Sequence, residues 1–255
     1  LENLSNTQKI KIINLNKYKD LKNLNIKNKS KVLFIVENPS NPFLKLISLK
    51  DLRENYKNSK IILDFSLSSL INHKDIKLAD LAVTSCTKYI SGHNDFLGGL
   101  VVTNNSKFNS KIWQYRSMAG SLIDPNSCYF LLRSLRTYDM RIEKMLINTS
   151  EVLNLISQNK NVKKIFYPGV FENKSEKRIK DETLNHSGSV ISFECNKKIN
   201  LCKNIENLNS IKMAPTFGSV DSLIEIPLYM SRGKDFDPKV DYGDALNNLL
   251  MSNRL

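Results

Sequence analysis

Residues 79–103 read Ala79-Asp-Leu-Ala-Val-Thr-Ser-Cys-Thr-Lys-Tyr-Ile-Ser-Gly-His-Asn-Asp-Phe-Leu-Gly-Gly-Leu-Val-Val-Thr103. Two short apolar runs, Ala79–Thr84 and Gly98–Thr103, flank the polar segment 85–95. Short apolar runs bounded by glycines and polar residues are typical of buried strands. The stretch therefore predicts two strands joined by a polar connection.

The chain before this stretch shows the same alternation of apolar and helical segments. Val32–Val36 and Lys60–Asp64 are short apolar runs, and Leu46–Tyr56 between them carries apolar and charged residues at helical spacing. Strands that are apolar throughout, rather than alternating, are typical of parallel sheets covered on both faces. We therefore predict an α/β fold with a mostly parallel sheet.

The C-terminal half predicts a second, smaller unit. Residues 126–158 contain few helix breakers and have apolar residues at spacings near three and four, which indicates one or two helices leaving the sheet. A further helix is expected near residues 200–208. It lies among three expected strands, Val162–Phe166, Ser189–Glu194 and Ile211–Phe217.

The composition is that of a folded protein: 41% of the 255 residues are hydrophobic, 8% are aromatic and 25% are charged. These values exclude a disordered or collagen-like chain. The longest apolar run, Val32–Val36, is far too short to cross a bilayer. No N-terminal segment has the pattern of a secretion signal. We therefore expect no membrane partner.

Charge and cysteine content argue against two further classes. The formal net charge is +13, but the lysines are spread along the chain without basic clusters or interleaved aromatics, so we expect no nucleic-acid partner. The four cysteines show no C-x-x-C spacing and the chain has only three histidines, so we expect no metal site. Cysteines without such a pattern fit a reducing compartment, and we predict a cytoplasmic protein.

In an open parallel sheet, ligands bind at the carboxyl ends of the strands, and polar residues gather at these ends. Asn41 lies in the loop after the first strand, and Asp64 ends the second. Ser85, Thr87 and Lys88 follow the third strand, where hydroxyls can bind a phosphate and a neutral amine can attack a carbonyl. From the residues alone, Asp64 is either a turn-capping residue or a functional carboxylate.

The segment Ser85–Asp95 closely resembles the cofactor-lysine segment of the Cys/Met-metabolism family of pyridoxal-phosphate enzymes. This family contains cystathionine γ-synthase, cystathionine β- and γ-lyases and methionine γ-lyase. The resemblance continues in order from about Lys31 to Met230. The other matching segments are Glu37–Pro42, Ala79-Asp80, Gly98-Gly99, Leu131–Thr137 with Arg141, Tyr167–Gly169 and Ala214–Leu223.

The resemblance implies a fold and a cofactor. The fold would be the type I, aspartate-aminotransferase-like arrangement of a large PLP-binding α/β domain, residues 1–142, and a small C-terminal α+β domain, residues 143–255. The cofactor would be pyridoxal 5′-phosphate. Because the family's members are longer, the resemblance also implies a chain that is incomplete at both ends, with the N-terminal part of the large domain missing.

Five residues acquire cofactor roles from the resemblance. Lys88 would bind the cofactor aldehyde covalently and later move protons between substrate carbons. Asp64 would pair with the protonated pyridine nitrogen, so that the ring can accept electron density. Ser85 and Thr87 would hydrogen-bond the cofactor phosphate, and Asn41 the phenolic oxygen of the ring.

Two more residues would contact the substrate. Thr216 stands where the family has a serine near the substrate carboxylate, and it keeps the hydroxyl. Arg254-Leu255 matches the first two letters of the family's R-[LF]-S-x-G motif, whose arginine binds the α-carboxylate. Departures from the family pattern at Phe65, Ser134 and Ser219 leave one alternative open, a catalytically decayed homologue that acts as a non-enzymatic partner.

Within the family, Gly92–Asp95 and Ala214–Gly218 most resemble cystathionine γ-synthases. The expected reaction is therefore γ-replacement, in which cysteine displaces the ester group of an activated homoserine to give cystathionine. Cystathionine β- or γ-lyase and methionine γ-lyase activities are the alternatives, because the same groups support elimination. The family also implies a homodimer or homotetramer with sites shared across the interface, acting on small amino-acid substrates in methionine biosynthesis and cysteine metabolism.

Overall fold

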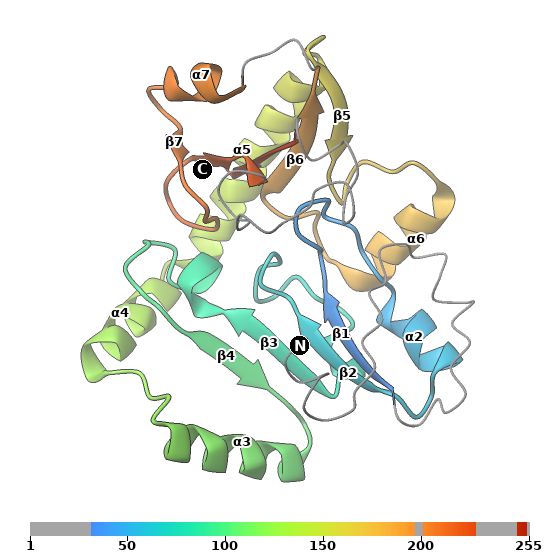
Figure 1. Cartoon of the computed structure of the whole chain (residues 1–255), viewed down its shortest axis with the longest axis vertical. Coiled ribbons are helices and arrows are strands. Elements are labelled where there is room, and N and C mark those ends of the chain that lie inside the picture. The colour runs from blue at the N-terminus through green and yellow to red at the C-terminus, as the bar shows by residue number, and fades with distance from the viewer. Residues whose placement is uncertain (1–31, 197–200, 228–248, 254–255) are drawn as a thin grey trace.

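Two β-sheets organise the chain in the computed structural model, which describes residues 32–196, 201–227 and 249–253. The first sheet has the order β1-β2-β3-β4 and the second the order β5-β6-β9-β8-β7 (Figure 1). The strands of the first sheet are β1 (Leu33–Glu37), β2 (Lys60–Asp64), β3 (Leu81–Ser85) and β4 (Gly99–Val102). All four were expected from the apolar runs: β2 has the expected ends, and the ends of the other three differ by one or two residues.

The first sheet is mostly parallel, as predicted. β1 pairs with β2 and β2 with β3 in parallel, whereas β4 returns antiparallel to β3. In the register of these pairs, Glu37 lies opposite Asp64, and Asp64 lies opposite Val83. The carboxyl ends of β1, β2 and β3 therefore meet along one edge of the sheet.

Helix α2 (Leu49–Asn55) covers one face of this sheet. Its N-terminus is capped by the Ser48 side chain, which accepts a hydrogen bond from the backbone N–H of Asp51. Leu49 and Leu52 are fully buried and pack with alternate residues of β1 and β2. The helix spacing predicted from the sequence thus places its apolar side on the sheet.

The expectation that helices cover both faces of the first sheet is wrong for the described residues. The residues of β1 alternate between exposed and buried, and the side chains of Leu33 and Ile35 are about half exposed, at 54% and 51%. All four residues of β4 are exposed. The strands are apolar on both sides, but among the described residues the α2 side is the buried one.

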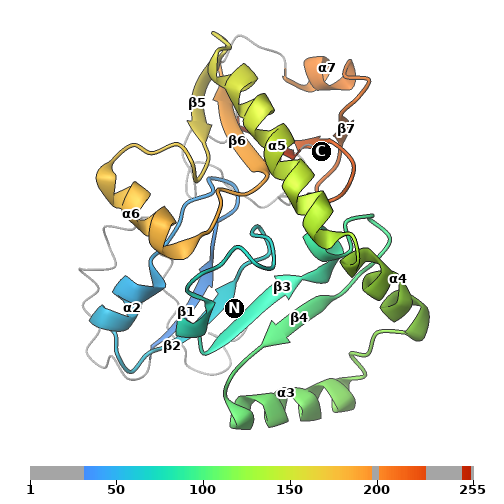
Figure 2. The ribbon, with the colours of Figure 1, turned by 180° about the vertical axis from the view of Figure 1, so that it is seen from behind.

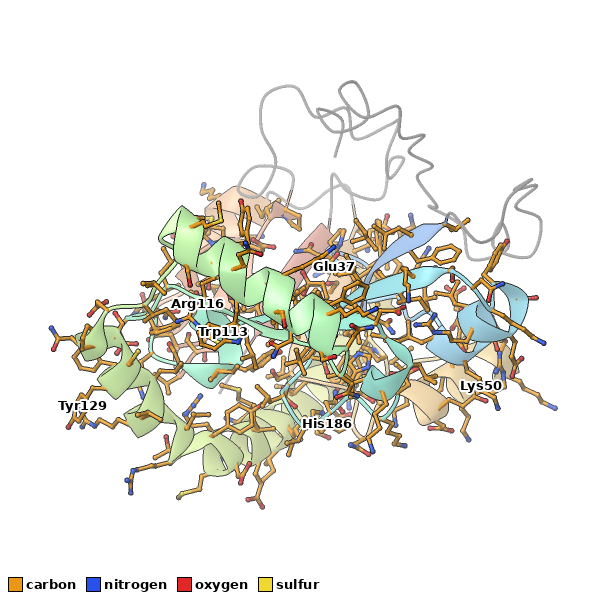
Figure 3. All side chains as sticks on the ribbon, turned by 90° about the horizontal axis from the view of Figure 1, so that it is seen from below. Glu37, Lys50, Trp113, Arg116, Tyr129 and His186 are labelled. Atoms are coloured by element: carbon orange, nitrogen blue, oxygen red, sulfur yellow. The ribbon has the colours of Figure 1, made fainter. Side chains whose placement is uncertain are left out.

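Two helices that follow β4 carry further exposed apolar side chains. These helices are α3 (Ser106–Ala119), capped by the Asn105 side chain, and α4 (Pro125–Leu135), capped by Asp124. Helix α3 was not predicted from the sequence, and its residues are mostly exposed. Figure 3 shows Trp113 and Arg116 side by side on α3, with the guanidinium carbon 4.5 Å from the ring centroid. The exposed apolar residues of both helices are Trp113, Tyr115, Met118, Tyr129, Phe130, Leu132 and Leu135.

Helix α5 (Tyr138–Ser157) runs from the end of β3 to the second sheet (Figures 1 and 2). Its first half buries Tyr138, Ile142 and Met145 against the segment that follows β3. Its second half packs against the second sheet through Val152, Leu153 and Ile156. The expected domain boundary at residues 142 and 143 falls inside this continuous helix.

The second sheet contains β5 (Val162–Phe166) and β6 (Val190–Cys195), close to two of the expected strands. The third expected strand is short, because β7 covers only Lys212–Met213. Helix α7 (Leu201–Glu206) lies where a helix was expected. Three elements were not expected from the sequence: α6 (Lys174–Thr183), β8 (Leu223–Glu225) and β9 (Leu249–Asn253).

Direct contacts join the α6 region to α2 and to the connection between β2 and β3. His73 forms a β-bridge with Leu184. The Arg178 guanidinium donates to both carboxylate oxygens of Asp51 at the start of α2, at 2.8 and 3.3 Å.

None of the described helices combines the length and the apolar content that a membrane-spanning helix needs.

Candidate active site

The expected site residues at the strand ends come together because β1, β2 and β3 are parallel. Asp64 is the last residue of β2, and Ser85 is the last residue of β3. Asn41 lies in the loop after β1, where its backbone N–H donates to the Glu37 carboxylate at 3.0 Å. The backbone of Ser85 is tied to the segment after Asp64, since its N–H donates to the Ser66 hydroxyl at 2.9 Å. These residues therefore share one edge of the sheet.

Asp64 makes the contact expected of a turn-capping residue. Its Oδ1 accepts a hydrogen bond from the backbone N–H of Ser66 at 2.9 Å, and its carbonyl accepts one from Asn38 at 2.8 Å. The hydrogen bond from Ser66 uses Oδ1 alone, so the second carboxylate oxygen, Oδ2, can accept from a ligand. The side chain is half-buried at the strand end. The capping contact and a role in ligand binding are thus compatible.

Lys88 lies in a short helical turn directly after β3. The turn spans Cys86–Ile90, and Lys88 is the kink within it, with non-helical backbone angles of φ −87° and ψ −119°. Backbone hydrogen bonds from Ser91 to Cys86 and from Gly92 to Lys88 close the turn at 2.9 and 2.8 Å. The kink directs the lysine away from the path of a regular helix.

The Lys88 side chain points to a loop of the second sheet. Its Nζ donates a hydrogen bond to the Thr216 hydroxyl at 2.8 Å and lies 4.8 Å from the centroid of the Phe217 ring. Burial lowers the pKa of the Lys88 ammonium, while the negative charge of Glu225 opposes that shift. A half-buried lysine with a lowered pKa is a better nucleophile near neutral pH than a solvated one.

The loop that carries Thr216 packs tightly on the lysine turn, Cys86–Ile90. Gly218 has a left-handed φ of +79°, and a Cβ there would lie 2.8 Å from the backbone nitrogen of Tyr89. The N–H of Val220 donates to the carbonyl of Gly92 at 2.9 Å. Asn94 and Asp221 are joined by a side-chain hydrogen bond of 3.3 Å. The glycine is therefore required for the close approach that brings Thr216 to Lys88.

Thr87 is engaged within its own loop. Its hydroxyl accepts a hydrogen bond from the N–H of Gly98 at 3.1 Å and donates one to the Gly98 carbonyl at 3.4 Å. The hydroxyl holds the entry to β4 against the lysine turn. To bind a phosphate, the Thr87 hydroxyl would turn its single O–H donor from the Gly98 carbonyl to a phosphate oxygen, and it could still accept from the Gly98 N–H.

Some site residues were missed by sequence reasoning, and one cannot be placed. Phe217 and Glu225 both act on the Lys88 ammonium, yet neither stands out in the sequence because each is an ordinary core or strand residue. Arg141 was matched to the family pattern without a role, and it contacts the lysine turn. Arg254, the expected carboxylate-binding residue, lies outside the described residues.

The residues present fit a cofactor that carries an aldehyde, a phosphate and a ring nitrogen. The site offers a half-buried amine at Lys88, a carboxylate at the end of the neighbouring strand and the hydroxyl of Ser85. The buried Ser219 hydroxyl, next to the glycine that touches the lysine turn, has no hydrogen-bond partner in the structure. Within residues 32–196, 201–227 and 249–253, no group of acidic, histidine or cysteine side chains could hold a metal ion.

A mostly parallel sheet with a half-buried lysine after its third strand defines an α/β protein with a candidate nucleophilic lysine at the carboxyl end of the sheet. The particular family follows from a match of residues 3–241 to the family model described as Cys/Met metabolism PLP-dependent enzyme. The chain belongs to this family, and the family's cofactor is pyridoxal phosphate.

Curated relatives with different reactions match the chain about equally well. A cystathionine β-lyase from Lactococcus lactis subsp. cremoris is 28% identical over 93% of this chain and 63% of its own length. An L-methionine γ-lyase from Fusobacterium nucleatum subsp. polymorphum is 29% identical over 81% and 53%. A chloroplastic cystathionine γ-synthase from Arabidopsis thaliana is 29% identical over 78% and 36%. The chain thus spans less than two thirds of the length of these relatives.

Solved structures confirm the predicted fold class, that of type I PLP-dependent enzymes. A cystathionine γ-lyase from Lactobacillus plantarum, complexed with L-serine, matches with a TM-score of 0.86 and 25% identity, over 96% of this chain and 64% of that one. A cystathionine γ-synthase from Xanthomonas oryzae pv. oryzae matches with a TM-score of 0.88 and 24% identity, over 99% and 66%.

Proposed function

We propose that the full-length protein is a pyridoxal-phosphate-dependent enzyme of sulfur amino-acid metabolism. The observation that carries this proposal is the half-buried Lys88, whose Nζ donates a hydrogen bond of 2.8 Å to the hydroxyl of Thr216, a residue of the second sheet's loops. A solvated surface lysine would make its hydrogen bonds to water instead. Pyridoxal phosphate supplies an aldehyde for the lysine and an electron-withdrawing ring that stabilises negative charge on substrate carbons.

Lys88 would both hold the cofactor and carry the proton. Its lowered pKa makes a neutral amine available for the bond to the aldehyde. Once the substrate amine takes its place, the freed Nζ can accept a proton from one substrate carbon and return it to another. The Thr216 hydroxyl would accept a hydrogen bond from the freed Nζ, as it does in this structure, and so keep the amine beside the reacting carbons.

Asp64, Ser85, Thr87 and Asn41 would hold the cofactor at the carboxyl edge of the sheet. The Asp64 carboxylate would keep the pyridine nitrogen protonated, because a negative partner favours the charged form. Ser85 and Thr87 would donate hydrogen bonds to the phosphate, and Asn41 to the phenolic oxygen. Thr216 and Arg254 would bind the substrate carboxylate.

We propose γ-replacement as the reaction, with cysteine displacing the ester group of an activated homoserine to give cystathionine. Support comes from Gly92–Asp95 and Ala214–Gly218, which resemble cystathionine γ-synthases. A β- or γ-elimination is the second candidate, because the β-lyase and γ-lyase relatives are as similar in sequence as the γ-synthase. A decayed, non-enzymatic homologue is the third.

A product assay on the full-length protein separates these candidates. One set receives cysteine with O-succinyl-, O-acetyl- or O-phosphohomoserine, and the other receives cystathionine or methionine alone. Cystathionine from the first set supports the synthase, whereas pyruvate or 2-oxobutyrate from the second supports a lyase. Cofactor binding without any product would show a decayed homologue.

The Asp64 carboxylate gives an independent test of the cofactor site. Asp64→Asn keeps the shape and the capping oxygen but removes the charge that holds the pyridine nitrogen protonated. Turnover should fall by about a hundredfold, the scale on which a lost electrostatic partner at a reacting group acts, with little change in KM. Near-normal turnover would show that Asp64 serves only as a turn cap.

We also propose that the protein assembles as a homodimer or homotetramer in the cytoplasm. The exposed apolar side chains of α3, α4 and β4 support an interface between copies. Cys86, Cys128 and Cys195 carry free thiols, which fits a reducing compartment. Light scattering on the full-length protein gives the oligomeric state, and a monomer at micromolar concentration would contradict the assembly.

A further inference from the structure

One side chain from α5 donates hydrogen bonds to the carbonyl groups at the end of the lysine turn. Arg141 donates from Nη1 to the Tyr89 carbonyl at 2.9 Å and from Nη2 to the Ile90 carbonyl at 3.0 Å. These are the two residues that directly follow Lys88. The carbonyls at the end of a helical turn lack partners within it, so a donor from elsewhere must satisfy them when they are buried.

The same guanidinium is anchored to the junction of α4 and α5. Nη2 also donates to the Ser134 carbonyl at 3.1 Å, and Nε donates to the Thr137 hydroxyl at 3.3 Å. Arg141 is buried, with 8% of its surface exposed, and burial lowers its pKa. All four of these acceptors are neutral. A buried charge is costly without dipoles to solvate it, so the carbonyls and the guanidinium hold one another in place.

The main chain at Gly92 passes close to this guanidinium. Gly92 has a left-handed φ of +67°, and a Cβ there would lie 2.0 Å from Nη1 and 2.7 Å from Cζ of Arg141. The main chain that leaves the lysine turn therefore runs directly over the arginine. Only glycine permits this approach together with this backbone angle.

We infer that Arg141 is the positioning residue of Lys88: its guanidinium fixes the carbonyls of Tyr89 and Ile90 and so aims the lysine side chain at Thr216. The planar fork spans two successive carbonyls, which an ammonium cannot do. Arg141 acts through the main chain, because both of its hydrogen bonds to the turn go to backbone carbonyls. The inference deepens the proposed function and rests on it for the identity of the bound cofactor.

The test measures Lys88 directly and needs no turnover. Trace acetylation of the full chain with acetic anhydride over a range of pH, followed by peptide mass spectrometry, gives the titration of each lysine by its reactivity. In the wild type, Lys88 should become reactive at lower pH than a fully solvated lysine, because burial lowers its pKa. In Arg141→Met, the Lys88 side chain should leave its contact with Thr216, so the pH at which it reacts should rise towards that of a solvated lysine.

A second readout uses the cofactor itself. Incubation with pyridoxal phosphate and reduction with borohydride fixes the cofactor to lysines, and peptide mapping gives the share on Lys88. Arg141→Met should lower that share at least tenfold, since the loss of even one hydrogen bond to a charged group has about that effect and two to the turn are lost. Arg141→Lys keeps the charge but loses the fork, and it should fall between Arg141→Met and the wild type. Exposed Arg136→Met is the matched control and should behave as the wild type.

A pair of glycine variants separates positioning from a loss of folding. Gly92→Ala pushes the guanidinium aside while Arg141 remains, so it should reproduce the Arg141→Met change. Gly120→Ala is the control, because Gly120 has nearly the same φ, +68°, but a Cβ there meets nothing within 4 Å. Far-UV circular dichroism shows which variants remain folded, and Gly92→Ala and Arg141→Lys decide the outcome if Arg141→Met does not fold.

The results distinguish the inference from the proposed function. A folded Arg141→Met or Gly92→Ala variant with wild-type Lys88 titration and labelling would overturn the inference, since Arg141 would then only join α4 to α5. If the acetylation shift appears but pyridoxal phosphate never concentrates on Lys88 in the wild type, Arg141 positions the lysine and the proposed cofactor site is wrong.

Discussion

The Nζ of Lys88 lies 2.8 Å from the hydroxyl of Thr216, although the two residues are 128 positions apart in the sequence. One belongs to the turn after β3 in the first sheet, and the other to the loop before β8 in the second. The hydrogen bond joins the two halves of the chain at the group proposed to carry the reaction. The state of this lysine therefore depends on how the second sheet sits on the first.

Removing the charge of Glu225 should make Lys88 more acidic. The carboxylate of Glu225 raises the pKa of the Lys88 ammonium against the larger, lowering effect of burial. In Glu225→Gln the pKa should fall further, so that Lys88 becomes a neutral nucleophile at lower pH. The pH at which the acetylation rate of Lys88 reaches half its maximum measures the change.

Glu194 on β6 provides the matched control for this variant. It is also buried, but its partner is Lys163, whose Nζ lies 2.7 Å from its carboxylate. Glu194→Gln should leave the titration of Lys88 unchanged. A Lys88 titration that moved upwards in Glu225→Gln would contradict the electrostatic account.

Thr216→Val should disturb the lysine without disturbing the fold. The substitution keeps the branched shape but removes the hydroxyl that accepts the Lys88 hydrogen bond. We expect turnover of the full-length protein to fall by roughly ten- to a hundredfold, because a hydrogen bond to a charged group contributes about 1.5–3 kcal/mol. Thr216→Ser keeps the hydroxyl and should stay within about twofold of the wild type by the same argument.

Steady-state kinetics with a thermal-unfolding control tests this prediction. The unfolding temperatures of the two variants should agree closely, because Thr216 is only partly buried. Equal turnover in Thr216→Val and Thr216→Ser would mean that the hydroxyl has no part in placing Lys88.

The sequence predicted the elements that bury an apolar side. β2 lies at its expected residues, because an apolar run between polar breaks marks a buried strand. Helix α3 was missed because it has little of an apolar face within the chain, so its spacing resembles that of an exposed segment. The covering of the first sheet was predicted wrongly, because the same apolar run describes a strand buried on both sides and one with an exposed apolar side.

The site was predictable where its residues lie next to one another or at strand ends. Asp64 and Ser85 follow from the rule that parallel strands present their carboxyl ends together. Phe217, Glu225 and Arg141 could not be placed by that rule, since each reaches Lys88 or its turn from a distant segment. Their roles depend on the packing of α5 and the second sheet on the turn, which no local pattern encodes.

Asp80 should be a main source of acid sensitivity in the first sheet. Burial alone would raise its pKa, but hydrogen bonds from Lys60, Arg53 and the backbone N–H of Ile61 outweigh burial and lower it from 3.8 to about 2. A depressed carboxyl pKa adds stability above the unfolded pKa, and this stability is lost as the pH falls through the folded value. The shift corresponds to about 2 kcal/mol.

Asp80→Asn should therefore lower the melting temperature near neutral pH by about 5 °C, given the usual entropy of unfolding for a chain of this length. The difference from the wild type should shrink as the pH falls from about 4 towards 2. Asp139→Asn, an exposed carboxylate in the first turn of α5, is the control and should change little. A pH-independent difference for Asp80→Asn would point to lost packing rather than lost ion pairs.

Gly218→Ala should separate the two halves of the site. The added Cβ would lie 2.8 Å from the backbone nitrogen of Tyr89, so the loop that carries Thr216 must move off the lysine turn. Gly188→Ala is the control for backbone strain, because Gly188 has a similar φ of +86° but nothing within 4 Å of the added carbon. The left-handed conformation itself costs about 1–2 kcal/mol in either variant. Gly218→Ala should unfold at a lower temperature than Gly188→Ala, and only Gly218→Ala should move the Lys88 titration towards that of an exposed lysine. Identical unfolding and identical Lys88 titration in the two variants would mean that the loop has room to adapt, and that the close approach of Gly218 to Tyr89 does not hold Thr216 in place.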